Sequence, residues 1–171
     1  MTEIENGDKV VEIYLEKYEL YIGAIVGIRR HISSINSKKM NAVGNPNFNW
    51  SIDIESSCAE MAVAKALGFY WDNSVGTYKE ADIKPDIQVR QTEKEDGKLI
   101  VRPADSDSDK YVLVTGKWGK FKIHGWLYGK EAKIERFMFK GYNGMPDAWF
   151  VPQQELRDLN EIEYKQTELF Y

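Results

Sequence analysis

Four residues have side chains whose types and spacing could do chemistry together: Glu60, Asp82, Gln88 and Arg90. Glu60 lies among small apolar residues in the segment Ser57–Gly68. This composition predicts a helix that is hydrophobic almost all round and therefore buried. A carboxylate on a buried helix is costly unless it is paired, hydrogen-bonded or bound to a metal ion. Glu60 is therefore a candidate site residue.

The other three residues precede or occupy a predicted strand. Residues 87–92 alternate apolar and polar side chains, which places Gln88 and Arg90 on one face, and Asp82 comes shortly before them. Carboxylate and amide oxygens can bind Mg²⁺, and an arginine can bind a phosphate bidentately. Arg90 cannot act as a general base because its pKa is above about 12, so activation of water would fall to a bound metal ion.

An interpretation without chemistry stays open beside this one. In it, Glu60 forms a buried ion pair with Lys65 or Arg90, and the polar residues of the strand are ordinary. The acidic segment Asp105–Asp109 is interpreted as a polar turn. An EF-hand loop would need Gly and Glu at the places where Lys110 and Gly116 stand.

Composition favours a folded protein without a membrane span. The chain has 171 residues, 43% of them hydrophobic and 29% charged, and no apolar run approaches the ~20 residues that cross a membrane. A single cysteine, Cys58, and the lack of a signal-peptide pattern predict a cytoplasmic location. The net charge of −4 argues against a general nucleic-acid binder. A local basic group could still contact phosphates or simply end a helix: Arg29, Arg30, Lys38 and Lys39.

The candidate site residues must be positioned by helices and strands. The pattern of these predicted elements indicates an α/β (α+β) fold with a mixed central sheet of about five strands flanked by helices. Apolar spacing predicts an N-terminal helix over about 9–35. Residues 50–54 could form a short strand or an extended entry to the helix of Glu60, which Ser56 or Ser57 would cap and Gly68 would end. We expect one domain over 1–159, with a sheet core over about 50–152, and a polar tail over 160–171.

The strands are predicted from alternating or short apolar runs at 87–92, 98–102, 111–115, 121–127 and 148–151. The turn at 95–97 predicts that the first two strands pair as a hairpin. Residues 129–139 are expected to be a short helix or irregular. Pro152 is expected to open a closing helix that runs to about residue 159.

At Glu60, Asp82, Gln88 and Arg90 the chain resembles the PD-(D/E)xK nuclease superfamily. More closely, over about residues 20–159, it is similar to small uncharacterised proteins encoded by phages. The matching segments are Gly27–Arg30, Asp53–Lys65, Ala81–Ile83, Gln88–Arg90, Gly97–Arg102, Tyr111–Val114, Gly125–Leu127 and Trp149–Gln153.

The resemblance implies a restriction-endonuclease-like fold with a metal site on a bent hairpin. It implies that Glu60 is the helix carboxylate, that Asp82 is the principal ligand of Mg²⁺ or Mn²⁺, and that Asp86 is an alternative ligand. Gln88 stands where the superfamily has Asp or Glu, and Arg90 stands where it has Lys.

Three functional hypotheses follow, and the sequence leaves the choice among them open; the third is a plain structural or assembly protein. In the first, a metal-dependent nuclease holds the ion with Glu60, Asp82 and Gln88, meets the phosphate with Arg90, and follows the DNA backbone with the basic group. In the second, the fold is catalytically inactive and binds nucleic acid or a host or phage protein during infection. The oligomeric state is left open.

Overall fold

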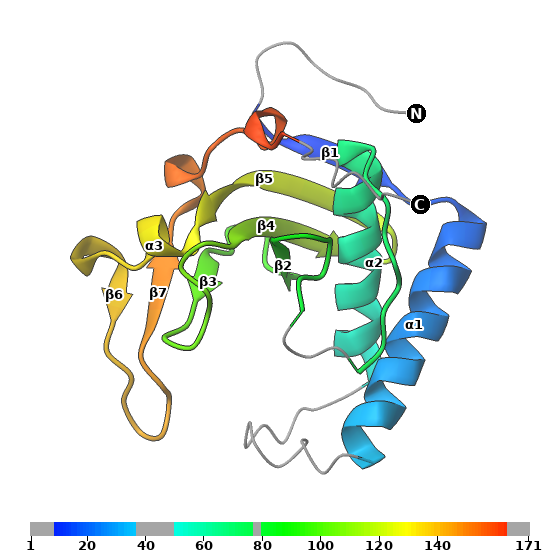
Figure 1. Ribbon diagram of the computed structural model, residues 1–171, viewed down its shortest axis with the longest axis horizontal. Helices are drawn as coiled ribbons and strands as arrows, with labels where there is room; N and C mark the ends of the chain where they lie inside the picture. The colour runs from blue at the N-terminus through cyan, green and yellow to red at the C-terminus, as the bar shows by residue number, and fades with distance from the viewer. Residues whose placement is uncertain (1–8, 37–49, 77–79, 164–171) are drawn as a thin grey trace, which may run out of the picture.

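The computed structural model describes residues 9–36, 50–76 and 80–163 of the chain (Figure 1). It is a mixed α+β protein with the following helices and strands: β1 (Val11–Tyr14), α1 (Lys17–Asn36), α2 (Trp50–Leu67), β2 (Ile87–Thr92), β3 (Leu99–Val101), β4 (Lys110–Lys117), β5 (Lys120–Tyr128), α3 (Gly129–Ala132), β6 (Met138–Phe139) and β7 (Ala148–Val151). Short 3-10 turns lie between α3 and β6 at Glu135–Phe137 and after β7 at Gln153–Glu155 and Leu159–Glu161.

The larger sheet is mixed and has the strand order β1-β5-β4-β2. Strands β4 and β5 form an antiparallel hairpin, β1 adds antiparallel to β5, and β2 adds parallel to β4. Strand β4 is the central apolar run: side chains of Val112 and Val114 point into one hydrophobic cluster, and those of Tyr111 and Leu113 point into the other. Both faces of this sheet are therefore covered, and β2 is an edge strand.

The smaller sheet has the order β3-β7-β6, with antiparallel pairing throughout. The predicted hairpin between residues 87–92 and 98–102 is therefore wrong, although both strands exist. Residues 87–92 pair in parallel with Lys110–Thr115, and Leu99–Val101 pair with Trp149–Val151 in the other sheet. Pairing with distant strands therefore outweighs the local turn at 95–97. The bent hairpin that the resemblance implied for the metal site is not formed by residues 87–102.

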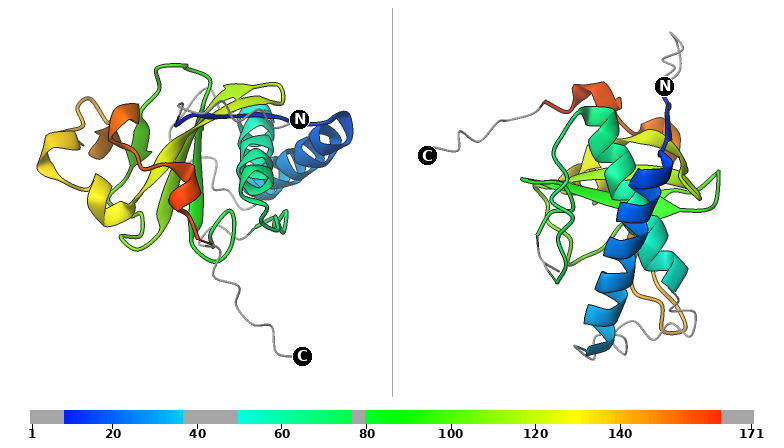
Figure 2. Two further views of the ribbon diagram at one scale, coloured as in Figure 1. Left: turned by 90° about the horizontal axis from the view of Figure 1, so that it is seen from above. Right: turned by 90° about the vertical axis from the view of Figure 1, so that its right-hand side faces the viewer.

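The two long helices stack outward from the larger sheet. Helix α2 packs against the sheet with Cys58, Ala59, Ala62 and Val63, and α1 lies on the far side of α2 (Figures 1 and 2). None of the helices in the described segments has the length and apolarity to cross a membrane.

Glycines let α1 approach α2 closely. A Cβ atom on Gly27 would lie 2.5 Å from the Cα atom of Ile54, and one on Gly23 would lie 2.6 Å from the Sγ atom of Cys58. Real Cβ atoms do not approach backbone that closely, so the two helices can pack at this distance only with glycine at residue 27. This contact fixes the register of Arg30 on α1 against Glu60 on α2.

Several predicted boundaries need correction. The N-terminal segment is not helical from residue 9, because Val11–Tyr14 forms β1 and the helix starts at Lys17. Residues 50–54 are the first turns of α2, whereas the predicted end of that helix at Gly68 is confirmed. The predicted closing helix is replaced by two 3-10 turns. Leu159 and Ile162 are buried in the core, so the start of the predicted polar tail is packed.

Candidate functional site

A polar pocket of about 730 Å³ lies where α1, the segment before β2, β2 itself and the turn before β4 meet. Ligand pockets commonly have volumes of about 300–1,000 Å³. Of the predicted residues, Arg30, Asp82, Gln88 and Arg90 line it. The other lining residues are Ser34, Asp53, Ser74, Gly76, Glu80, Ala81, Ala104, Asp105, Ser106, Asp109 and Tyr111.

Glu60 lies behind this pocket and is joined to it through Arg30. The guanidinium of Arg30 donates two hydrogen bonds to the Glu60 carboxylate, Nη1 to Oε1 at 2.5 Å and Nη2 to Oε2 at 2.9 Å. Trp71 Nε1 donates a third to Oε2 at 3.1 Å, and Arg30 Nε donates to the carbonyl of Ser74 at 2.9 Å. The expected alternative partners of Glu60 are wrong: Lys65 pairs with Glu19, and Arg90 pairs with Asp105.

Burial sets the ionisation of this pair. It raises the pKa of Glu60, and the nearby charge of Asp82 adds to that rise, so the pKa reaches about 7 even though Arg30 and Trp71 lower it. Burial lowers the pKa of Arg30, but hydrogen bonds and charge from Glu60 outweigh that effect and raise it above its ordinary value. Arg30 thus stays positively charged beside Asp82.

Asp82 is positioned by a tight turn of the backbone just before β2. Ile83 and Ile87 exchange two backbone hydrogen bonds of 3.0 Å, which turns the chain back on itself. The Oδ2 atom of Asp82 then accepts a 2.7 Å hydrogen bond from the backbone N–H of Val89 on β2. Burial raises the pKa of Asp82, while Val89, Arg90 and Arg30 lower it in part. Its Oδ1 atom has no hydrogen bond within the described part of the chain.

Gln88 and Arg90 project from β2 toward the acidic turn that precedes β4. Gln88 Nε2 donates to Asp109 Oδ2 at 3.1 Å, and Arg90 Nη2 lies 3.1 Å from Asp105 Oδ2. The Arg90 guanidinium also lies 5.0 Å from the ring centre of Tyr111. The side-chain nitrogen of Gln88 is engaged with Asp109. Its side-chain carbonyl oxygen is therefore the group that remains to bind a ligand.

Charge in the pocket is unbalanced. Five acids line it, namely Asp53, Glu80, Asp82, Asp105 and Asp109, whereas Arg30 and Arg90 are its cations among the described residues. Arg90 is paired with Asp105, and Arg30 is paired with Glu60. A phosphate would meet net negative charge here unless a cation accompanied it.

Asp82 and Gln88 are the residues of this pocket that could hold a Mg²⁺ or Mn²⁺ ion, in an open site rather than in a closed metal cage. Asp82 and Gln88 each have one uncommitted oxygen, and Mg²⁺ is often held by one or two carboxylates together with water and substrate phosphates. Within the described segments, no group of three His, Cys, Asp or Glu residues is arranged to hold a metal ion. Glu60 is occupied by Arg30 and Trp71, so we assign it to positioning rather than to metal binding.

The remaining predicted residues lie away from the pocket or outside the described segments. Asp86 pairs with Lys110 at 2.5 Å and lines a separate cavity, so it is not brought together with Asp82. Arg29 is exposed on α1, next to the inward-turned Arg30. Lys38 and Lys39 fall outside the residues that the structure describes.

The sequence interpretation missed two parts of the pocket. The sequence predicted Arg30 only as part of a basic group, and its pairing with Glu60 was missed. The available signal was the position of this arginine on an apolar helix, seven residues after Gly23. Residues Asp105–Asp109 do form a turn, as predicted, yet Asp105 and Asp109 also hold Arg90 and Gln88 in place.

Comparison of the chain with protein-family models, with curated proteins and with solved structures gives no match. The pocket therefore has to be interpreted from its own geometry and chemistry.

Proposed function

We propose that the pocket around Asp82 is the active site of a metal-dependent phosphodiesterase that acts on DNA. The observation that carries this proposal is that Asp82, Gln88 and Arg90 line one pocket, backed by the buried pair of Arg30 and Glu60. Bound Mg²⁺ or Mn²⁺ would stabilise charge on the phosphate and lower the pKa of water.

The protein residues then have separate roles. Asp82 and Gln88 hold the ion through one oxygen each, and Val89 orients the Asp82 carboxylate by its backbone N–H. Arg90 binds a phosphate oxygen, and Asp105 and the ring of Tyr111 orient its guanidinium. Glu60 acts through Arg30, which keeps a positive charge next to Asp82.

The proposal extends to the fold. We assign α2, the mixed sheet and the residues before β2 to a divergent restriction-endonuclease-like core of phage type. What supports this is a buried acidic helix packed on a mixed sheet whose strand β2 carries the Gln-x-Arg motif. The separate pairing of β2 and β3 is the main departure.

A specific observation favours the second candidate, an inactive module that binds nucleic acid or a host or phage protein. The carboxylate of Glu60, the amide nitrogen of Gln88 and the guanidinium of Arg90 are all engaged within the protein. Such satisfied networks are typical of structural sites as well as catalytic ones.

The deciding experiment is cleavage of plasmid and of single-stranded DNA in Mg²⁺ and in Mn²⁺. We expect cutting that requires the metal, and a loss of about a hundredfold or more in Asp82→Ala, because removing an ion ligand removes several kcal/mol of charge stabilisation. Asp86→Ala is the matched control, since it removes an aspartate from the other cavity.

Three outcomes separate the possibilities. Metal-dependent cutting that is lost only in Asp82→Ala supports the active site. Loss in Asp86→Ala with full activity in Asp82→Ala would move the ligand but keep the reaction class. Folded wild type that cuts no substrate in either metal would contradict the enzyme and favour the inactive module.

A further inference from the structure

A second cavity adjoins the pocket on the other side of Arg90. It has a volume of about 370 Å³ and lies between β2 and β3, with Ser56 of α2 and Leu113 of β4 also in its lining. It exists because β2 and β3 pair in different sheets, so their neighbouring edges are not joined by a ladder. Arg90 lines both this cavity and the pocket, and so connects them.

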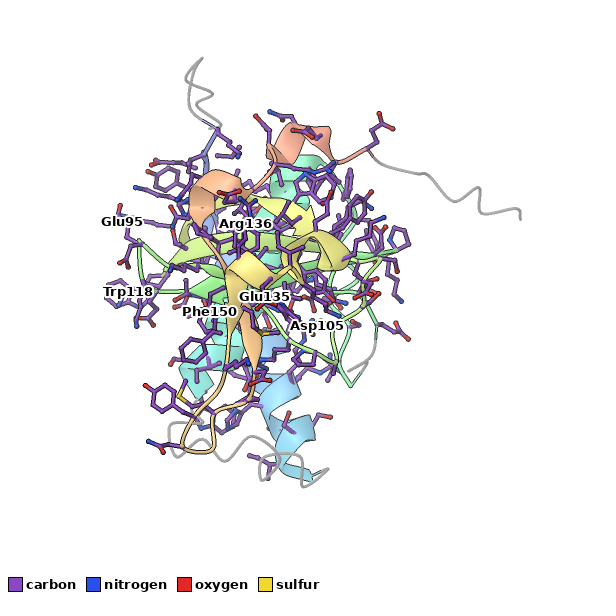
Figure 3. The ribbon with its side chains drawn as sticks, turned by 90° about the vertical axis from the view of Figure 1, so that its left-hand side faces the viewer. Glu95, Asp105, Trp118, Glu135, Arg136 and Phe150 are labelled. Atoms are coloured by element: carbon purple, nitrogen blue, oxygen red, sulfur yellow. The ribbon has the colours of Figure 1, made fainter. Side chains whose placement is uncertain are left out.

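The charge of this groove is opposite to that of the pocket. Its charged lining residues are Arg90, Lys98 and Arg102, and among the described residues no carboxylate lines it. Lys98 and Arg102 are exposed, and neither forms an ion pair within the described part of the chain. Two of the nearby acids are engaged elsewhere, since Glu93 pairs with Lys117 and Glu95 with Lys122, whereas Asp96 forms no ion pair within the described residues. Figure 3 shows Glu95 at the left edge of the molecule and Asp105 just right of its centre in that view.

We propose that this basic groove binds the phosphodiester backbone next to the phosphate that enters the pocket. The inference rests on the proposed function. It assumes that the DNA strand whose phosphate binds Arg90 continues along the groove past Lys98 and Arg102. Unpaired cations that line a groove release counterions when they neutralise phosphates, and this gives affinity without base sequence preference. The polar side chains of Gln91 and Thr92 in the same lining suit phosphate and sugar contacts.

The test is anisotropy of labelled single-stranded and duplex DNA in EDTA, over a series of salt concentrations. We expect Lys98→Ala/Arg102→Ala to bind about tenfold more weakly, with a slope of log K against log salt that is smaller by about two. Lys94→Ala is the control, because this exposed lysine lies between β2 and β3, as Lys98 does, but does not line the groove.

Failure of this inference differs from failure of the proposed function. If wild type does not bind DNA in EDTA, or if the double variant keeps the slope of Lys94→Ala, the groove inference is wrong even for an active nuclease. If the slope falls as expected but no metal supports cutting, the groove stands and the phosphodiesterase proposal is wrong.

A different observation carries a second inference, which concerns the outer face of α1. Seven large apolar side chains on this helix are between 38% and 64% exposed: Tyr18, Tyr21, Ile22, Ile25, Ile28, Ile32 and Ile35. They are not needed for the core, because the inner face packs on α2 through Gly23, Gly27 and Val26. Figure 2 (right) shows α1 as the outermost layer, in front of α2.

The spacing of this stripe points to a helix as its partner. Tyr18, Tyr21, Ile25, Ile28, Ile32 and Ile35 follow one another at alternating intervals of three and four residues, which is the seam of a coiled coil. The set is also symmetric about its centre. Two antiparallel copies would match Tyr18 with Ile35 at the ends, Tyr21 with Ile32, and Ile25 with Ile28 at the centre, and each match would occur twice.

We propose that a second copy of this chain covers the stripe by antiparallel pairing of α1 with α1. The seven side chains expose roughly 100 Å² each, so at most about 700 Å² per copy would be buried, which lies within the roughly 600–1,000 Å² per partner of a standard interface. The pairing is two-fold symmetric, and it places Arg29 opposite Ala24 rather than opposite a like charge.

Sedimentation or light scattering of the full chain tests this inference. We expect a dimer in wild type, a monomer in Ile25→Glu/Ile28→Glu, and an unchanged dimer in Met145→Glu, a control at an exposed apolar residue outside α1. A monomeric wild type at every concentration, or a dimer that survives Ile25→Glu/Ile28→Glu, would overturn it. Disulfide cross-linking tests whether the two α1 helices run antiparallel. Oxidation should cross-link two copies of Tyr21→Cys/Ile32→Cys but not two copies of Tyr21→Cys alone. Cross-linking of the single variant would indicate parallel pairing and contradict the proposal.

Discussion

At the scale of single residues, each polar side chain of the candidate site is kept in place by an ion-pair or hydrogen-bond partner. Arg30 holds Glu60, Val89 holds Asp82, Asp109 holds Gln88, and Asp105 holds Arg90. Charge-assisted hydrogen bonds of this kind are short and directional, so they fix side-chain orientation as well as adding stability. The cost is burial of Glu60, whose side chain is only 5% exposed.

That cost predicts a pH dependence of stability. The pKa of Glu60 is raised from 4.5 to about 7 in the folded chain, so between these values the folded state binds more protons than the unfolded state. Stability from this group is therefore present below about pH 4.5 and is lost as pH rises toward 7, by roughly 1 kcal/mol per pH unit at most. Urea unfolding at pH 5 and pH 8 should show wild type losing stability relative to Glu60→Gln. The opposite trend would mean that Arg30 lowers the pKa of Glu60 below its ordinary value.

Gln88 offers a second prediction at this scale, because a neutral ligand binds hard cations weakly. Gln88→Glu alone would place a carboxylate against Asp109, so the informative variant is Gln88→Glu/Asp109→Asn, which keeps a donor and an acceptor at the 3.1 Å contact. We expect this variant to bind Mn²⁺ about tenfold more tightly than wild type, since ligand charge tunes affinity. Isothermal titration with Asp109→Asn as control measures it. Equal affinity in the two variants would remove Gln88 from the ion site.

At the scale of elements, the contact of α1 with α2 decides whether Arg30 reaches Glu60. In an open helix, Gly27→Ala would stabilise the protein by about 1 kcal/mol through helix propensity. Here the new Cβ atom would meet the backbone of Ile54, so we expect a loss of about 1–3 kcal/mol in the free energy of unfolding. Chemical denaturation gives the sign directly. A more stable Gly27→Ala would show that the helices pack farther apart than described.

Local patterns predicted much of the element content but not how strands choose partners. The alternation in residues 87–92 and the apolar runs around Val112 and Ile123 gave strands at the right places. The turn at 95–97 suggested a hairpin, but β2 pairs with β4 and β3 pairs with β7, and burial decides such long-range pairing. For the same reason Val11–Tyr14, which suits a helix or a strand, becomes β1 beside β5.

The candidate site was predictable to the extent that it lies in one sequence segment. Asp82, Gln88 and Arg90 are close along the chain, and they line one pocket. The pairing of Arg30 with Glu60 was not predicted because the two residues are thirty apart in the chain, and only the glycine contact between α1 and α2 sets their register. Asp86 was weighed as an alternative to Asp82 on sequence proximity, but the turn between Ile83 and Ile87 directs it to another cavity.

At the scale of the whole molecule, two neighbouring surfaces differ in charge, and the chain carries a net charge of −4. Under the proposed function, the basic groove would attract phosphates, and the acidic pocket would repel them until a divalent ion is bound. We therefore expect Mg²⁺ to raise DNA affinity in wild type at constant ionic strength, by about tenfold, although added salt ordinarily weakens such binding. Anisotropy with and without Mg²⁺ measures this change. Asp82→Ala should lose the increase; an equal increase in Asp82→Ala would place the ion elsewhere.

The place of β1 in the sheet has a consequence for the newly made chain. Val11 pairs with Ile123, so β1 leaves the ribosome long before its partner strand β5 is made. At about 5–20 residues per second, some 110 residues take roughly 5–20 seconds to synthesise. Throughout that interval α1 has its apolar stripe exposed and β1 has no partner strand, because β5 is not yet made. Nascent chains on neighbouring ribosomes could therefore meet through α1 before either is complete, and assembly would begin during translation.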